Sequence, residues 1–224
     1  MERRAYVTGT ERGLGLALTA ELLERGYRVY AGAYHADHPE LDELGERSGG
    51  RLRVLPLDVT DQDSVDAAAG AIAVDGGRLD LLINNAGLAL DRSRTMEDPF
   101  YWDDMHAVME VNAFGPLRVT RSVIDFLRAS DRGVLVNISS IAGSIGSLTR
   151  THQYAYTMSK AALNTQSKLI HNHFGPEGLT VLVVHPGAMP TLILGDPEVT
   201  RSAPVTTGES ARGIVALAER TWGA

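Results

Sequence analysis

The chain has 224 residues, a formal net charge of −7 and no cysteine. This length suits one α/β domain with a sizeable buried core, and the acidic balance leaves no basic surface for a nucleic acid partner. The lack of cysteine excludes disulfides, thiolate catalysis and zinc–thiolate sites. The amino-terminal residues lack the apolar core of a signal peptide, and no stretch is long enough to span a bilayer. We therefore expect a cytoplasmic protein without a membrane partner.

Apolar runs of strand length alternate along the chain with longer segments of helical periodicity. In chain order the strands are expected at 4–9, 27–33, 52–59, 79–87, 133–140 and 179–187, and the helices that follow them at 13–25, 39–47, 61–75, about 100–128, 154–174 and 208–220. Because consecutive strand positions are apolar, the sheet should be parallel and covered on both faces. The sequence predicts a Rossmann-type doubly wound α/β fold, with residues 1–224 as one domain and ligands at the carboxyl ends of its strands.

The segment TGTERGLG, residues 8–15, follows the first predicted strand and opens the first predicted helix. In this position Gly9 can form a tight turn, Gly13 lets the backbone approach a pyrophosphate, and Gly15 allows close packing of helix and strand. The start of the helix offers unbonded N–H groups and the positive end of its dipole to phosphates. A plain turn is the alternative, but the strand–loop–helix context favours a dinucleotide site.

The segment YAYTMSK, residues 154–160, places Tyr156 and Lys160 four residues apart, so that the two side chains share one helix face. Taken alone, this pair is better explained as a tyrosine packed over a lysine stem, because both residues are common and the spacing is short. Tyr154 offers a second phenol, but the residue four positions after it is Met158, which cannot lower a pKa. Tyr156 is therefore the better candidate for proton transfer.

These motifs, in this order, resemble those of the short-chain dehydrogenase/reductase family. They are T-G-x-x-x-G-x-G at 8–15, NNAG at 84–87, Asn112, Ser140, the Tyr156 and Lys160 pair, and the PG turn at 186–187 followed by Thr191. The likeness covers nearly the whole chain. The interval of sixteen residues from Ser140 to Tyr156 is longer than is usual in the family. Together with SKAALN at 159–164, it is similar to the C-factor-like members and the small carbonyl reductases.

The resemblance implies hydride transfer between NADP(H) and a carbonyl or secondary alcohol, catalysed by Asn112, Ser140, Tyr156 and Lys160. Tyr156 would be the general acid/base, since a cation about 4 Å from a phenol lowers its pKa of about 10 by up to roughly three units. Ser140 would hold the substrate oxygen, and its neighbour Ser139 should face the other side of the strand. Asn112 would anchor a water of the proton relay, although a mid-helix asparagine usually faces solvent or bonds a nearby carbonyl.

The resemblance also implies a set of cofactor-binding residues. These are Gly9, Arg12, Gly13, Leu14, Gly15, Tyr34, Asp58, Val59, Asn85, Ala86, Gly87, Tyr156, Lys160, Pro186, Gly187, Met189 and Thr191. At the end of the second strand Ala33 stands where NAD-specific members carry an acid, and nothing there should repel a 2′-phosphate. Arg12 suits a phosphate, while Tyr34 replaces a second arginine. We expect NADP(H) to be preferred and NAD(H) to be accepted.

The remaining expectations concern architecture, partners and rival functions. Only TWGA follows the last predicted helix, so we expect six strands, with the family's seventh missing or vestigial. The loop at 143–153 should wall the substrate pocket, and family likeness implies a homodimer or homotetramer through the helices near 100–128 and 154–174.

His171 and His173 point apart on a helix and predict no metal site. The alternative function is a nucleotide-sensing or signalling protein that binds NAD(P) with little or no turnover.

Overall fold

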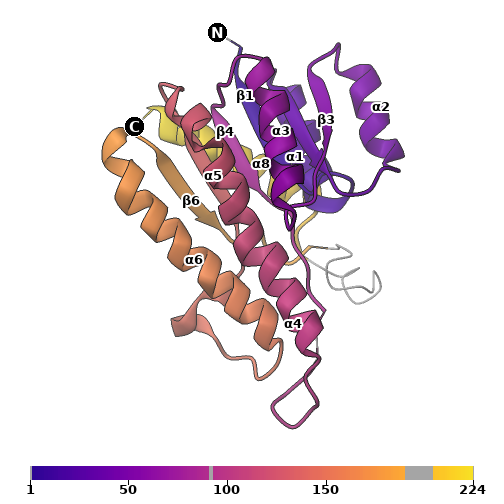
Figure 1. Ribbon diagram of the computed structural model, residues 1–224, viewed down its shortest axis with the longest axis vertical. Helices are drawn as coiled ribbons and strands as arrows, with labels where there is room; N and C mark the ends of the chain where they lie inside the picture. Colours follow the sequence, from indigo (N-terminus) through magenta and orange to yellow (C-terminus); the bar gives the residue numbers. More distant parts are fainter. Residues whose placement is uncertain (1, 91–92, 190–203, 224) are drawn as a thin grey trace.

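The protein is built around one parallel sheet, seen in a computed structural model that describes residues 2–90, 93–189 and 204–223. The six strands run in the order β3-β2-β1-β4-β5-β6 (Figure 1). Their bounds are β1 Arg4–Thr8, β2 Arg28–Ala33, β3 Leu52–Pro56, β4 Leu81–Asn84, β5 Val134–Ile138 and β6 Thr180–Val184. The predicted doubly wound fold is confirmed, and no described residue forms a strand beyond β6. On that edge Val183 is 44% exposed.

Helices cover both faces of this sheet. The α-helices are α1 Gly13–Glu24, α2 Pro39–Arg47, α3 Gln62–Val74, α4 Trp102–Met109, α5 Gly115–Arg128, α6 Tyr154–Phe174 and α8 Thr207–Arg220. Short turns are η2 Ile141–Gly143, η3 Ile145–Ser147, η4 Gly175–Glu177 and η6 Thr221–Gly223, and a π-helical turn, η1 Glu110–Phe114, joins α4 to α5. The last feature corrects the expectation of one continuous helix over 100–128. No helix in the described ranges combines the length and the apolarity that crossing a membrane requires.

Neighbouring residues of each central strand enter different cores, which explains the unbroken apolar runs. Val7 of β1 and Ile83 of β4 pack with α1 and α8, whereas Tyr6 and Leu82 pack with α3 and α5. In Figure 1, α5 and α6 lie side by side in front of the sheet, with α8 behind it. Side chains of a strand alternate between the two faces of the sheet. A strand that is buried on both faces therefore carries apolar residues at nearly all consecutive positions.

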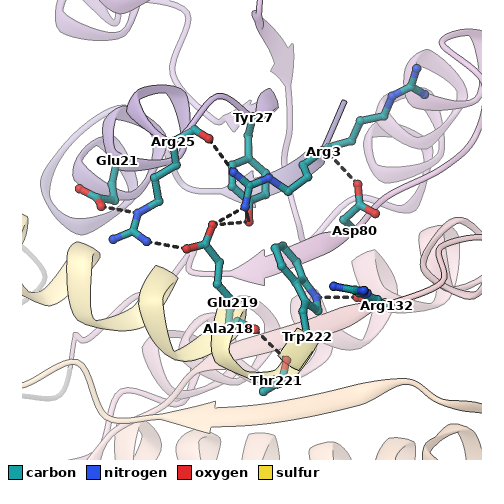
Figure 2. Close-up of polar contacts among 11 residues, drawn as sticks. Arg3, Glu21, Arg25, Tyr27, Asp80, Arg132, Ala218, Glu219, Thr221 and Trp222 are labelled. Atoms are coloured by element: carbon teal, nitrogen blue, oxygen red, sulfur yellow. Dashed lines mark hydrogen bonds and ion pairs between the residues drawn. The ribbon is translucent and has the colours of Figure 1, made fainter. Parts of the chain in front are cut away.

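The end of the described chain is held by charged and aromatic contacts at the amino-terminal side of the sheet (Figure 2). Glu219 of α8 accepts hydrogen bonds from Arg3 at 2.6 Å, from Arg25 at 2.5 Å and from the Tyr27 hydroxyl at 3.1 Å. Trp222 donates its ring N–H to the carbonyl of Arg132 at 2.8 Å, and its ring lies 6.1 Å from that of Tyr27. Glu219 and Trp222 thus fasten the end of α8 to the residues that precede β1, β2 and β5.

Candidate active site

A cleft of about 1050 Å³ opens where the six strands end. One residue from each strand end lines it: Gly9 after β1, Tyr34 after β2, Asp58 after β3, Asn85 after β4, Ser140 after β5 and Pro186 after β6. This volume lies at the upper end of ligand pockets and suits a dinucleotide with a small second molecule. The carboxyl ends of a doubly wound sheet are where such ligands bind.

Nearly all the residues predicted from sequence line this one cleft. They are Gly9, Arg12, Gly13, Leu14, Gly15, Tyr34, Asp58, Val59, Asn85, Ala86, Gly87, Ser140, Tyr156, Lys160, Pro186, Gly187 and Met189. Asn112 lies behind the wall, and Thr191 lies outside the described residues. The fold therefore gathers motifs that are spread over 180 positions of the chain, although it does not by itself assign their roles.

The glycine loop is held closely against the NNAG segment. A side chain at Gly9 would place its Cβ 2.8 Å from Cα of Ala86, and one at Gly15 would place it 1.9 Å from the Gly9 carbonyl oxygen. Asn85 donates its amide N–H groups to the carbonyls of Thr8 and Gly9, both at 2.9 Å. The Thr8 hydroxyl accepts in return from the backbone N–H groups of Asn85 and Ala86 at 3.0 Å. Only glycine fits at positions 9 and 15, and the four hydrogen bonds between Thr8–Gly9 and Asn85–Ala86 fix the shape of the loop.

The first turn of α1 faces the cleft with its backbone donors free of a side-chain cap. Arg12 is the capping residue, and no side-chain hydrogen bond satisfies the N–H groups that follow it. Unbonded N–H groups at a helix start bind anions, helped by the helix dipole. The glycine loop and this helix start therefore fit the pyrophosphate of a dinucleotide, and the exposed Arg12 adds a positive charge beside them.

The end of β2 holds a carboxylate that the sequence did not reveal. Glu11, from the glycine loop, accepts hydrogen bonds through Oε1 from the backbone N–H groups of Tyr34 and His35, the second at 3.0 Å. Two successive N–H groups form an anion-binding concavity, and here an anionic side chain occupies it. The expectation that nothing near Ala33 would repel a 2′-phosphate is therefore wrong, because Glu11 reaches this place from another loop.

Asp58 and Val59 line the floor of the cleft after β3. The Asp58 carboxylate accepts hydrogen bonds from the backbone N–H of Thr60 at 2.8 Å and from its hydroxyl at 2.7 Å. These bonds fix the turn, in which Val59 is buried with its side chain next to Gly115. The carboxylate is thus held in place rather than solvated freely at the strand end.

Tyr156 and Ser140 meet on the opposite side of the cleft from Glu11. Burial raises the pKa of the Tyr156 phenol, while a hydrogen bond with Ser140 and the positive charge of Arg150 act to lower it. Ser140 begins the turn η2, where its hydroxyl accepts from the N–H of Ala142 at 3.2 Å. A buried phenol with a raised pKa stays protonated at neutral pH, which makes it a proton donor.

Lys160 is buried beneath this pair. Its Nζ donates to the carbonyl of Ile138 at 2.8 Å and lies 5.8 Å from the centre of the Tyr156 ring. Burial lowers the pKa of the amine from 10.5 to about 8. The expectation that Lys160 would bring the Tyr156 pKa below 10 is not met here, because burial of the phenol outweighs the effects that lower its pKa, and the amine points to a backbone carbonyl.

The two choices between neighbouring residues follow from where each side chain points. Ser139 also lines the cleft, but its hydroxyl donates to the Asn164 side chain at 2.6 Å, whereas Ser140 contacts the phenol. Tyr154 packs edge-on against Phe100 with ring centres 5.3 Å apart, and it is not part of the cleft lining. Ser140 and Tyr156 are thus the pair that faces the cleft together.

Asn112 sits in the π-helical turn η1 and is fully buried. Its side-chain oxygen accepts from the N–H of Leu88 at 2.8 Å, and its amide donates to the Leu88 carbonyl at 2.7 Å and to Ser159 at 3.1 Å. Turns of this kind often occur at functional sites. Asn112 does not face solvent; it joins the NNAG segment to α6.

The loop at 143–153 lines the cleft near Tyr156, with residues that the sequence did not single out. Thr149, Arg150, His152 and Gln153 all line the cleft. Gln153, which directly precedes α6, has φ +63° and is the one residue other than glycine with positive φ among those described. Arg150 donates a hydrogen bond to the Gln153 side chain. The unusual length of the Ser140 to Tyr156 interval was the available signal for these residues.

Comparison with known proteins matches this arrangement to a family. The sequence matches the family model of the short chain dehydrogenases over residues 3–198. The chain belongs to the short chain dehydrogenase family. Members of this family are NAD(P)-dependent oxidoreductases with a Rossmann fold.

Individual relatives are distant but align along most of the chain. Short chain dehydrogenase pigC of Monascus ruber is 34% identical over 204 residues, which is 88% of this chain but 65% of the relative, so the chain spans less than two thirds of that length. Cyclopentanol dehydrogenase of Comamonas testosteroni is 31% identical over 219 residues, 94% of this chain and 85% of the relative. The structure of NADPH-bound carbonyl reductase from chicken fatty liver superposes with a TM-score of 0.84 at 31% identity, over 96% of this chain and 90% of the other.

Replacing Lys160 with methionine should stabilise the fold. The unfolded chain binds more protons than the folded chain between pH 8 and 10.5, because the folded pKa is lowered to about 8. The burial penalty is therefore complete below pH 8 and fades as the pH rises towards 10.5. This difference amounts to about 3 kcal/mol at most. Urea unfolding should show Lys160→Met more stable than the natural chain at pH 7, with the gap narrowing at pH 9.5.

Lys168, an exposed lysine of the same helix, provides the matched control. Lys168→Met should change neither the free energy of unfolding nor its dependence on pH. A Lys160→Met chain that is less stable than the natural one at pH 7 would show that the bond to Ile138 outweighs the burial penalty.

Proposed function

We propose that this protein transfers a hydride reversibly between NADP(H) and a carbonyl or secondary alcohol, and that residues 1–224 act as one cofactor and substrate domain. The observation that carries the proposal is that the Ser140 and Tyr156 pair lies in the same cleft as the glycine loop and the start of α1. The likeness to a carbonyl reductase and a cyclopentanol dehydrogenase supports a small carbonyl or alcohol as the substrate.

Each residue of the catalytic set has a separate task. The Ser140 hydroxyl donates a hydrogen bond to the substrate oxygen and fixes its distance from the Tyr156 phenol. Tyr156 delivers a proton to that oxygen during reduction and removes one during oxidation. Bound nicotinamide supplies or accepts the hydride. Because burial keeps the phenol protonated at neutral pH, reduction should proceed at pH 7, and oxidation should quicken as the pH rises.

Lys160 and Asn112 act from behind the reacting groups. Lys160 holds the end of β5 through Ile138 and places a positive charge beneath the phenol, which stabilises the phenolate that forms in reduction. Asn112 holds the Leu88 backbone with both polar groups of its side chain. We include it as a positioning residue for the NNAG segment and, as its family resemblance implies, for a water of the proton relay.

Tyr156→Phe tests the catalytic role. The change removes the proton donor and keeps the ring, so NADPH-dependent reduction of cyclopentanone or another small ketone should fall by at least about a hundredfold. Cofactor affinity, measured by quenching of protein fluorescence, should change little. Tyr154→Phe is the matched control, since that ring lies outside the cleft lining, and it should keep its activity. A natural chain that binds NADPH but reduces no carbonyl in a broad panel would favour the nucleotide-sensing alternative.

The cofactor preference depends on two opposite charges in the glycine loop. Arg12 favours a 2′-phosphate, and solved relatives in this family hold NADPH or NADP. Glu11 opposes it, because its carboxylate already accepts the N–H groups at the end of β2. We propose that NADP(H) displaces this carboxylate and that NAD(H) binds without displacing it, which lets the protein accept both.

Glu11→Gln should therefore tighten NADPH binding by roughly tenfold or more, since like charges a few ångströms apart repel by about 1–3 kcal/mol. NADH binding should change less than threefold. Titration calorimetry with both cofactors measures the two affinities. Glu24→Gln, an exposed change at the far end of α1, is the control and should alter neither. Equal gains in affinity for NADPH and NADH would contradict the role assigned to Glu11.

We also propose self-association as a homodimer or homotetramer through the outer faces of α5 and α6. Leu117 of α5 and Leu169 of α6 are 41% and 63% exposed, on helices that lie side by side (Figure 1). Exposed apolar side chains on adjoining helices are typical of interfaces. Light scattering should give a mass of at least two chains, and Leu169→Asp should lower it towards one. Val74→Asp, at a still more exposed position on α3, should not.

A further inference from the structure

The charged groups of the cleft are divided between its two ends. The carboxylates in its lining, Glu11 and Asp58, follow β1 and β3, at the end that faces Tyr34. Around Tyr156 the described lining holds two cationic side chains, Lys160 and Arg150, and two histidines, His152 and His185, without a carboxylate. Burial lowers the pKa of His185, so that ring is neutral at pH 7. Lys160 is buried and donates to the Ile138 carbonyl, so Arg150 is the permanent positive charge on the partly exposed wall beside the reacting groups.

Arg150 has a neutral partner in place of a carboxylate. It donates to the side-chain oxygen of Gln153, and it forms no ion pair with any residue in the described ranges. A guanidinium carries five N–H donors, and one neutral acceptor leaves donors in the fork for a further group. Arg150 is only partly exposed, and its charge is felt at the Tyr156 phenol. Arg150 and Tyr156 also line the same cleft, so one small molecule bound there can face both side chains.

The backbone that presents Arg150 is strained. Gln153 adopts φ +63° and ψ 51°, a left-handed conformation unusual for a residue with a side chain, and is only 6% exposed. Such a conformation costs about 1–3 kcal/mol and persists only where surrounding structure imposes it. Here it fixes the side-chain oxygen that holds Arg150. The long segment between Ser140 and Tyr156 thus contains, near its end, an arginine whose side chain is held by Gln153.

We infer that Arg150 binds an anionic group of the substrate, so that the preferred substrates are oxo acids and the corresponding hydroxy acids. This inference rests on the proposed reductase function and narrows its substrate class. Planar carboxylates pair with the guanidinium fork through two parallel hydrogen bonds. In reduction the carbonyl carbon gains the hydride from the reduced nicotinamide, the oxygen gains the proton of Tyr156, and the carboxylate on Arg150 remains unchanged.

Matched acids and esters test the assignment. The probes are 2-oxopentanoate and 4-oxopentanoate, each compared with its methyl ester, which keeps the carbonyl and removes the charge. For the natural chain, kcat/KM should be higher for at least one acid than for its ester. Arg150→Gln should reduce that ratio by about tenfold or more, mainly by raising KM for the acid. Arg150→Lys, which keeps the charge, should retain most of the preference.

The outcomes separate this inference from the proposed function. If the esters are reduced as well as the acids, or if Arg150→Gln slows both equally, the inference is wrong while the reductase function stands. If no probe is reduced, the proposed function loses its support, and calorimetry with the same acids still decides the anion site. Binding of an acid that is lost in Arg150→Gln and kept in Arg150→Lys supports the site, and no binding to the natural chain overturns it.

Discussion

The hydrogen bond from the buried Lys160 amine to the Ile138 carbonyl ties the start of α6 to the end of β5. Tyr156 lies one turn before that lysine, and Ser140 lies two residues after that carbonyl. The bond therefore sets the distance between two side chains that belong to elements separated by a long loop. Burial of this amine lowers its pKa to about 8, so keeping it at this place reduces the stability of the fold. A chain that keeps it accepts a loss of stability at the place where chemistry occurs, which is common in enzymes.

Side-chain amides brace the other loops around the cleft. Asn85 holds the glycine loop, Asn112 holds Leu88, and Asn164 bonds both Ser139 and the Gly143 carbonyl. Below them Asn84 donates to Asn137 at 2.8 Å, joining the neighbouring strands β4 and β5. An amide both donates and accepts, so one side chain can satisfy an N–H and a carbonyl of an irregular segment at once. The cleft is thus shaped by fixed polar contacts in loops that carry no regular structure.

The fold could be predicted from the sequence because its signals are local. Unbroken apolar runs such as 81–83 indicate a parallel sheet, and the glycine loop is recognised from its place between strand and helix. The π-helical turn at Asn112 was missed, because the segments on both sides of it are helical and the sequence pattern predicts one helix over residues 100–128. The raised pKa of Tyr156 was also missed, because it depends on burial, which spacing does not report.

The charged groups that tune the site were beyond sequence reasoning for a different reason. Glu11 acts on Tyr34 and His35, and Arg150 acts on Tyr156, across loops whose shapes come from tertiary contacts. Glu11 stood inside a quoted motif, yet its carboxylate was not associated with the end of β2. Arg150 stood in a loop expected to wall the pocket, but nothing in the sequence indicated that it faced the phenol. Sequence patterns do not predict long-range polar contacts of this kind, because the loop shapes that make them depend on the folded structure.

The contact between Arg3 and Glu219 joins positions 216 residues apart. The apolar side chains of α8, including Ile214 and Val215, complete the same core as Leu18 and Leu22 of α1. During synthesis, one apolar side of α1 therefore stays uncovered until residues 207–220 have left the ribosome. Closure over such a separation is slow, and the half-made protein is open to aggregation and to chaperone binding throughout that interval.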